Sequence, residues 1–363
     1  MWTRVYSDSQ GDRAAWDSFV AACPDGGVLQ SSAWAAFKRQ AGWRSLRLAA
    51  GDGSTPVAGA QILLRSLPLS LFSVAYAPRG PLGQWQRGAA ADVLWPALHA
   101  ALRRQRAIFL KIEPNALPAP DLSETLRTLG FTANSGHIQP VATFQLDLTP
   151  DLEAIRAAQK SKTRYNTGLA GRKGVEISEG STADLSIIYP LLQETSQRDG
   201  FPIHTLDYYQ ALLQNMPGVS RLTIARHDGD LLAAIFVTAF GREAIYLHGA
   251  SGALKRNLMP TYLIQWEAIQ WAKARGCSYY DLWGIPEDAT EETQVEDGQA
   301  RDQPRDDGLW GVYRFKSGFG GRLVRYAGSF DYVYSAPFYR LWTELLPRYR
   351  AILLRRLGMH NDR

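Results

Sequence analysis

The sequence predicts an α/β (α+β) protein of two tandem domains, each a twisted mixed sheet flanked by helices. Its two halves repeat one order of segments, at an offset of roughly 170 residues. In each half an Asp-Gly dipeptide separates two apolar runs, at Asp52-Gly53 and at Asp228-Gly229. This dipeptide indicates a β-hairpin, because the tight turn requires positive φ angles that Gly and Asp tolerate. A third strand, a long helix and a final strand follow each hairpin, so the repeat indicates a duplicated domain.

The chain of 363 residues suits two domains that each bury a core. We assign 1–147 with 328–363 to the first domain, and 148–327, with an acidic loop at 287–308, to the second. In the first half we expect helices at 12–22, 32–41 and 89–106, and strands at 45–50, 57–65, 72–77 and 107–112. In the second half we expect helices at 151–171, 183–197, 206–215 and 260–275, and strands at 219–226, 231–240, 243–249 and 278–283. The last part predicts two strands within 311–334 joined by a glycine-rich turn, and a basic amphipathic helix at 338–358 that Pro347 interrupts.

Composition restricts the class of protein. Hydrophobic residues make up 45% and charged residues 21%, and no window has the roughly 20 apolar residues of a membrane-spanning helix. The N-terminus has no signal-peptide pattern, so we expect a cytoplasmic protein. Cys23 and Cys277 lack the spacing of a disulfide framework or a zinc site and are expected to be ordinary buried cysteines. The net charge of +5, concentrated at 156–173 and 340–356, favours polyanionic partners.

Four segments have patterns that point to a site. Residues 313–321 read YRFKSGFGG, and residues 30–38 read QSSAWAAFK. Residues 198–209 read RDGFPIHTLDYY, and residues 111–114 read KIEP at the end of a predicted strand. Together they resemble the Fem family (FemABX) of peptidoglycan-bridge aminoacyltransferases, and the resemblance covers nearly the whole chain. It implies two tandem GNAT-like (acyl-CoA N-acyltransferase-like) domains, the first binding the precursor and the second on the aminoacyl-tRNA side.

The resemblance also implies roles for individual residues. Lys316, beside Phe315, would stabilise the oxyanion of acyl transfer, and Glu113 would accept a proton. The substrate-binding residues would be Trp34, Lys38, Tyr76, Arg79, Arg198, His204, Tyr208, Tyr246 and His248, and the tRNA-binding residues would be Lys160, Lys162 and Arg164. At His204 the sequence departs from the family, which has arginine there, and a neutral imidazole offers one hydrogen bond where arginine offers a charged fork.

Several readings of function remain open. The main one is transfer of Gly, Ala or Ser from aminoacyl-tRNA to the side-chain amine of a UDP- or lipid-linked muropeptide precursor. This reaction needs no metal and no cofactor. We expect the protein to be a monomer whose C-terminal helix contacts the inner membrane face peripherally. One alternative is an acyl-CoA-dependent N-acyltransferase, which 254–260 disfavours because the segment lacks the glycines of a pyrophosphate loop. The other is a non-catalytic protein that binds tRNA or precursor.

Overall fold

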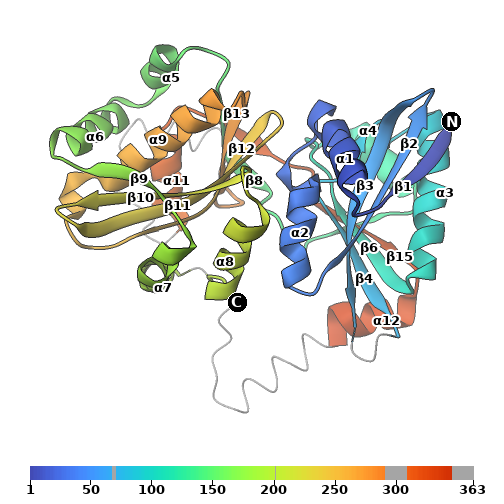
Figure 1. Ribbon diagram of the computed structural model, residues 1–363. Helices are drawn as coiled ribbons and strands as arrows, with labels where there is room; N and C mark the ends of the chain where they lie inside the picture. Colours follow the sequence, from blue (N-terminus) through green and yellow to red (C-terminus); the bar gives the residue numbers. More distant parts are fainter. Residues whose placement is uncertain (68–70, 201, 291–308, 346–363) are drawn as a thin grey trace. The chain divides into compact units, whose positions relative to one another are not determined.

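The computed structural model describes residues 1–67, 71–200, 202–290 and 309–345. The chain divides into two compact units (Figure 1). Unit 1 is Met1–Gln139 with Tyr326–Arg363, and unit 2 is Pro140–Arg325. The domain boundary expected after residue 147 lies beyond the division at Gln139, because strand β8 (Ala142–Asp147) pairs with strands of unit 2.

Unit 1 is built on one mixed sheet, in the order β1-β2-β3-β4-β6-β15-β7, with β5 paired to β3. Its strands are β1 (Trp2–Tyr6), β2 (Arg44–Asp52), β3 (Thr55–Ser66), β4 (Ser73–Pro78), β5 (Leu82–Gly83), β6 (Ala107–Glu113), β7 (Thr132–Asn134) and β15 (Ser329–Val333). Its helices are α1 (Gln10–Ala22), α2 (Ser32–Gln40), α3 (Ala89–Arg104), α4 (Pro120–Thr128) and α12 (Ala336–Arg340). Helices α1 and α2 cover one face of the sheet, and α3 covers the other (Figure 1).

Unit 2 has a sheet of the order β14-β8-β13-β12-β11-β10-β9. Its strands are β8, β9 (Glu176–Gly180), β10 (Ser220–His227), β11 (Asp230–Phe240), β12 (Glu243–Ser251), β13 (Tyr279–Gly284) and β14 (Arg322–Arg325). Its helices are α5 (Leu152–Ala158), α6 (Ser161–Arg172), α7 (Leu185–Asp199), α8 (Leu206–Asn215), α9 (Pro260–Ala274) and α11 (Leu309–Ser317). Helices α6 and α9 lie on one face, and α7 and α8 lie on the other (Figure 1).

The two units repeat one arrangement, as the sequence predicts. In each, an antiparallel hairpin (β2–β3, β10–β11) leads to a strand that pairs in parallel with the strand after a long helix (β4–β6, β12–β13). The hairpin turns hold Gly53 at φ 55°, and Asp228 and Gly229 at φ 51° and 83°. These left-handed angles are the reason for the Asp-Gly dipeptides. The predicted fold class is confirmed.

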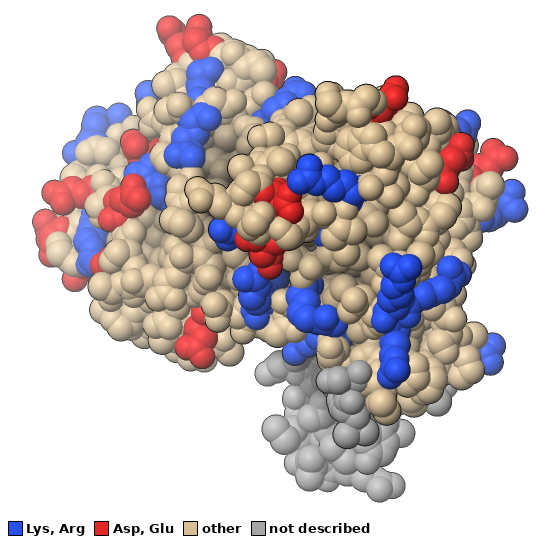
Figure 2. Space-filling model, turned by 45° about the vertical axis from the view of Figure 1, so that its right-hand side comes forward, with Lys and Arg blue, Asp and Glu red and all other residues tan. Residues whose placement is uncertain are grey.

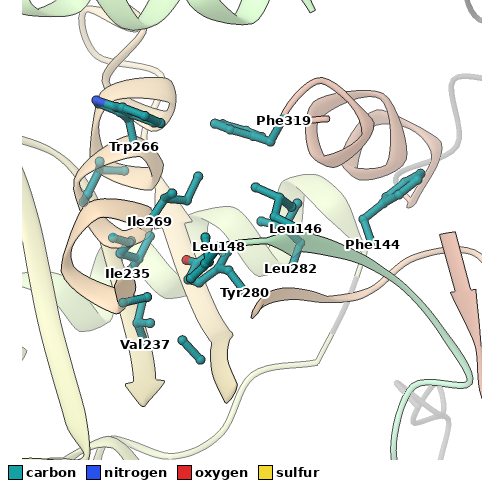
Figure 3. Packing of buried hydrophobic residues seen from close by; sticks show 14 of the residues in the cluster. Phe144, Leu146, Leu148, Ile235, Val237, Trp266, Ile269, Tyr280, Leu282 and Phe319 are labelled. Atoms are coloured by element: carbon teal, nitrogen blue, oxygen red, sulfur yellow. The ribbon is translucent and has the colours of Figure 1, made fainter. Parts of the chain in front are cut away.

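The core of unit 2 lies between its sheet and α9. The side chains of Leu146, Ile235, Tyr280 and Leu282 project from the strands and meet Trp266 and Ile269 of the helix (Figure 3). Phe319, which follows α11, closes the same cluster. Both cysteines, Cys23 and Cys277, are buried and free, as expected.

Some predicted elements differ from the structure. The helix expected at 151–171 is two helices, α5 and α6, because the chain turns at Gln159-Lys160. The first of the two strands expected within 311–334 is wrong, because residues 311–317 belong to helix α11. Strands β14 and β15 follow this helix. Two expected elements lie partly outside the described residues. They are the acidic loop at 287–308, from residue 291 onward, and the C-terminal helix at 338–358 with its break at Pro347, from residue 346 onward. No helix among the described residues is long and apolar enough to cross a membrane.

Candidate active site

A cavity of about 1150 Å³ opens in unit 2. Its walls come from β12, from the first turn of α9, from the end of α7 and from α11. Eight of the residues singled out from the sequence line it: Lys160, Lys162, Arg198, His204, Tyr246, His248, Phe315 and Lys316. Segments far apart in sequence therefore meet at one site within a single unit.

Lys316 is the most buried cation of this cavity, with 6% of its surface exposed. Its Nζ donates a 2.7 Å hydrogen bond to the carbonyl of Gly284 and lies 5.5 Å from the ring centroid of Tyr246. Burial lowers the pKa of Lys316 to about 7, and the nearby carboxylate of Asp281 opposes that shift. The lysine therefore exchanges its proton near neutral pH, and it faces the cavity from a helix and not from a hairpin turn.

The glycines after Lys316 fit the end of α11 against the α5–α6 turn. A Cβ on Gly318 would lie 2.4 Å from Oγ1 of Thr163, and one on Gly320 would lie 2.3 Å from the carbonyl oxygen of Ala158. Gly320 also has φ +83°, which L side chains rarely adopt. The Lys160 N–H donates to the Gly318 carbonyl at 2.9 Å. The glycines thus bring the protein's own backbone segments together and fix the position of Lys316.

A bulge in β13 presents the carbonyl that Lys316 contacts. The pairing of β13 with β8 shifts register between Asp281 and Gly284, and Trp283 has φ 61°. Such an angle is strained for a bulky side chain and persists only where the surroundings impose it. Here the buried carboxylate of Asp281 accepts the Trp283 N–H at 2.6 Å and also accepts the Thr143 hydroxyl. Asp281 and Trp283 are not predicted from the sequence, because DLWG has only the pattern of a strand end.

An aromatic cluster forms another wall. The ring of His204 stacks on Tyr208 with centroids 3.7 Å apart, and His248 lies edge-on at 5.4 Å from His204. Tyr208 therefore supports His204 from behind and does not itself line the cavity. Arg198 is bound to Asp199 through two hydrogen bonds and donates to the Ser251 carbonyl at 2.6 Å. Three of the five N–H donors of its guanidinium are therefore bonded within the protein itself.

The predicted tRNA-binding residues separate into two groups. Lys160 and Lys162 are exposed at the cavity, and Nζ of Lys160 lies 3.3 Å from Oγ of Ser317. Arg164 instead donates to the carbonyls of Ala157 and Gln159 and so caps the end of α5. The structure brings the two lysines to the site and gives Arg164 a local role.

The remaining predicted residues lie in unit 1. Lys38 on α2 lies 4.9 Å from the ring centroid of Trp34, and burial lowers its pKa to about 8. Arg79 is buried, has φ 49°, and stacks its guanidinium 3.6 Å from the ring centroid of Tyr326.

Glu113 lies where β6 ends and is 2% exposed. Its carboxylate accepts the hydroxyl of Tyr76 and the backbone N–H groups of Ile138 (2.6 Å) and Gln139 (3.1 Å). The Gln139 side chain in turn donates to the Tyr76 hydroxyl at 2.8 Å. In this arrangement Glu113 holds the backbone of Ile138 and Gln139 against the sheet of unit 1.

Two GNAT-like units, one with a buried lysine in a large cavity, define an acyltransferase fold with a built site. The FemAB family model matches residues 12–128, 121–231 and 225–346. The chain belongs to the FemAB family, and it is an aminoacyltransferase of that family.

Individual relatives agree with this assignment. The chain is 23% identical over 406 residues to the Lipid II:glycine glycyltransferase of Staphylococcus saprophyticus, covering 92% of this chain and 94% of that protein. It is 24% identical to the protein of the same name from Staphylococcus haemolyticus, with the same coverage. The crystal structure of FemX matches with a TM-score of 0.80 at 20% identity, over 93% of this chain and 99% of that one. A tandem GNAT protein from the clavulanic acid biosynthesis pathway shares the fold at a TM-score of 0.50 and 12% identity, over 91% and 98%.

Proposed function

We propose that the protein transfers Gly, Ala or Ser from aminoacyl-tRNA to the side-chain amine of a peptidoglycan precursor stem peptide. The observation that carries the proposal is the ammonium of Lys316, buried in the unit 2 cavity and held there by the Gly284 carbonyl. The names of the staphylococcal relatives support glycine as one candidate donor group and lipid II as one candidate acceptor.

In this reaction the amine attacks the ester carbonyl and the ribose hydroxyl leaves. The ester already stores the driving force, so the protein mainly has to orient two substrates and stabilise the developing negative charge. Lys316 would supply that positive charge in a site where burial strengthens it. Lys160 and Lys162, exposed at the cavity, would contact the phosphates of the tRNA end.

The turn before α9 argues against the coenzyme A alternative. In that turn the N–H groups of Leu258, Met259 and Tyr262 bond to carbonyls of the same segment, and Pro260 has no N–H. A pyrophosphate cradle needs backbone N–H groups that point at the ligand. Three N–H groups of this turn are already committed and a fourth position has none, which favours the tRNA-dependent reaction.

The test combines purified protein, charged tRNA and purified precursor, with the product weighed by mass spectrometry. We expect a mass increase of one amino acid residue. Lys316→Ala should slow turnover by about 10²–10³-fold, as expected for removal of an oxyanion-stabilising group. The matched control is Lys273→Ala, because Lys273 also donates to backbone carbonyls, those of Leu148 and Pro150, but lies outside the cavity.

Three results would contradict the proposal. Equal rates for Lys316→Ala and wild type would remove the assigned role of Lys316. A product formed with acyl-coenzyme A and not with charged tRNA would replace the proposed donor, and binding of both substrates without any product would indicate a non-catalytic protein.

A further inference from the structure

One end of the unit 1 sheet exposes a group of large apolar side chains. It is the end where β4 and β6 begin and β15 finishes, and we call it the apolar end. The side chains are those of Leu71 (51% exposed), Val333 (37%), Phe338 (39%) and Leu341 (42%). Leu71 lies two residues before β4, Val333 ends β15, and Phe338 and Leu341 belong to the C-terminal helical segment. Exposed apolar groups that cluster in this way indicate an interaction surface.

The apolar end has a firm base. The rings of Phe72 and Phe338 lie 4.2 Å apart, and Trp43, Tyr339 and Trp342 pack on the buried side chains of Val74, Ile108 and Phe109. The Tyr339 hydroxyl donates to the buried carboxylate of Asp331 at 2.7 Å, and that carboxylate pairs with Lys111 at 2.9 Å. Helix α12 is thereby anchored to the sheet, so its exposed residues are presented in a fixed arrangement.

The charges around this surface are almost all positive. The segments that form it, 43–44, 65–67, 71–74, 103–109 and 333–344, contain six arginines and one acidic residue, Glu344. The arginines are Arg44, Arg65, Arg103, Arg104, Arg106 and Arg340. At the lower right of Figure 2 the charged side chains in view are Lys or Arg, drawn in blue.

We infer that the apolar end is a docking surface for a bilayer that carries anionic phospholipid headgroups. Leucine and phenylalanine side chains enter the boundary between headgroups and acyl chains, while surrounding arginines contact the phosphates. Apolar insertion alone would suit any bilayer, and the six arginines select an anionic one. This inference goes beyond the proposed function, and it favours the lipid-linked form of the acceptor.

The test is co-sedimentation of the full chain with vesicles, without any tRNA or precursor. Wild type should bind vesicles of phosphatidylglycerol and not vesicles of phosphatidylcholine, and salt should weaken the binding. The double variant Leu71→Asp with Leu341→Asp should lower the partition coefficient by at least about tenfold, because it removes two inserting groups and adds two repelled charges. Leu117→Asp is the matched control, since Leu117 is 57% exposed in unit 1 but follows the other end of β6.

The possible results distinguish failure of the proposed docking surface from failure of the proposed transfer reaction. Equal sedimentation of the double variant and wild type, or equal binding of wild type to neutral vesicles, would overturn the inference. Concentration-dependent self-association that the double variant abolishes would assign the surface to a second copy of the chain and would overturn it too. Transfer to a soluble precursor should be unchanged in the double variant while transfer to a vesicle-embedded precursor falls. Absence of transfer to either acceptor in wild type would contradict the proposed function alone.

Discussion

The ammonium of Lys316 and the carbonyl of Gly284 are joined by a 2.7 Å hydrogen bond, although 31 residues separate them in the chain. The carbonyl comes from a bulged strand, and the lysine comes from the last turn of a helix. A neutral amine and an ammonium can both donate this bond, so the contact fixes the position of Nζ without fixing its charge.

The first prediction concerns the pH dependence of transfer. Burial lowers the pKa of Lys316 to about 7, so the fraction of protein with the ammonium falls as pH rises through that value. If the ammonium stabilises the oxyanion, kcat/KM should fall above about pH 7, while deprotonation of the acceptor amine acts in the opposite direction. The measurement is kcat/KM for the acceptor precursor, with charged tRNA at saturation, from about pH 5.5 to about pH 9.

The control for this profile is Lys316→Arg. A guanidinium stays protonated throughout that range, so the falling limb near pH 7 should disappear even if the absolute rate is lower. A rate that rises through pH 7 in wild type but not in the Arg variant would instead assign Lys316 as a proton acceptor. An unchanged limb in the Arg variant would show that another group titrates.

The second prediction concerns Asp281 as a positioning residue. Its carboxylate is 1% exposed, holds the Trp283 N–H, and raises the pKa of Lys316 against the effect of burial. Asp281→Asn keeps the shape and removes the charge. The pKa of Lys316 should then fall further, and the descending limb of kcat/KM should move to lower pH.

Thr143→Val is the matched variant for Asp281→Asn. It removes a hydroxyl that donates to Asp281 but leaves the carboxylate charge in place. The position of the limb should therefore stay near that of wild type. If the descending limb of kcat/KM lies at the wild-type pH in both variants, and they differ only in thermal midpoint, Asp281 is purely structural.

The site also shows what the sequence can and cannot predict. The Asp-Gly turns and Pro260 at the start of α9 are local signals, and the elements that they mark are correct. Residues 311–317 alternate aromatic and polar groups, which fits a strand as well as the helix that forms. The roles of Asp281 and of the glycines after Lys316 depend on backbone approaches between distant segments, which no local pattern contains.

The third prediction tests the glycine-dependent approach. In Gly320→Ala the new Cβ would lie 2.3 Å from the Ala158 carbonyl oxygen, at a φ of +83°, and neither backbone can move freely. We expect a loss of about 2–4 kcal/mol in the free energy of unfolding, measured by urea titration. Gly311→Ala is the control, because nothing lies within 4 Å of its Cβ and the residue is within helix α11. That variant should be neutral or more stable by up to about 1 kcal/mol. Equal stability of the two variants would contradict the tight packing of this turn.

The last prediction separates two roles for Glu113. If Glu113 is the predicted proton acceptor, Glu113→Gln should lower the rate by about 10²–10⁴-fold. Its three hydrogen bonds indicate a different result. A glutamine can accept through only one oxygen, so one of the donors from Tyr76, Ile138 or Gln139 must lose its partner. An unsatisfied buried donor costs about 1–3 kcal/mol, which should appear as a lower urea midpoint.

Tyr76→Phe is the control for this pair of outcomes. It removes one donor to Glu113 and leaves the carboxylate itself and both backbone donors in place. If Glu113 is a clamp, Glu113→Gln and Tyr76→Phe should both lower stability, and their rates measured well below the unfolding transition should stay within about tenfold of wild type. If Glu113 takes the proton, only Glu113→Gln should lower the rate by about 10²–10⁴-fold, and it should do so at a temperature where the variant is still fully folded.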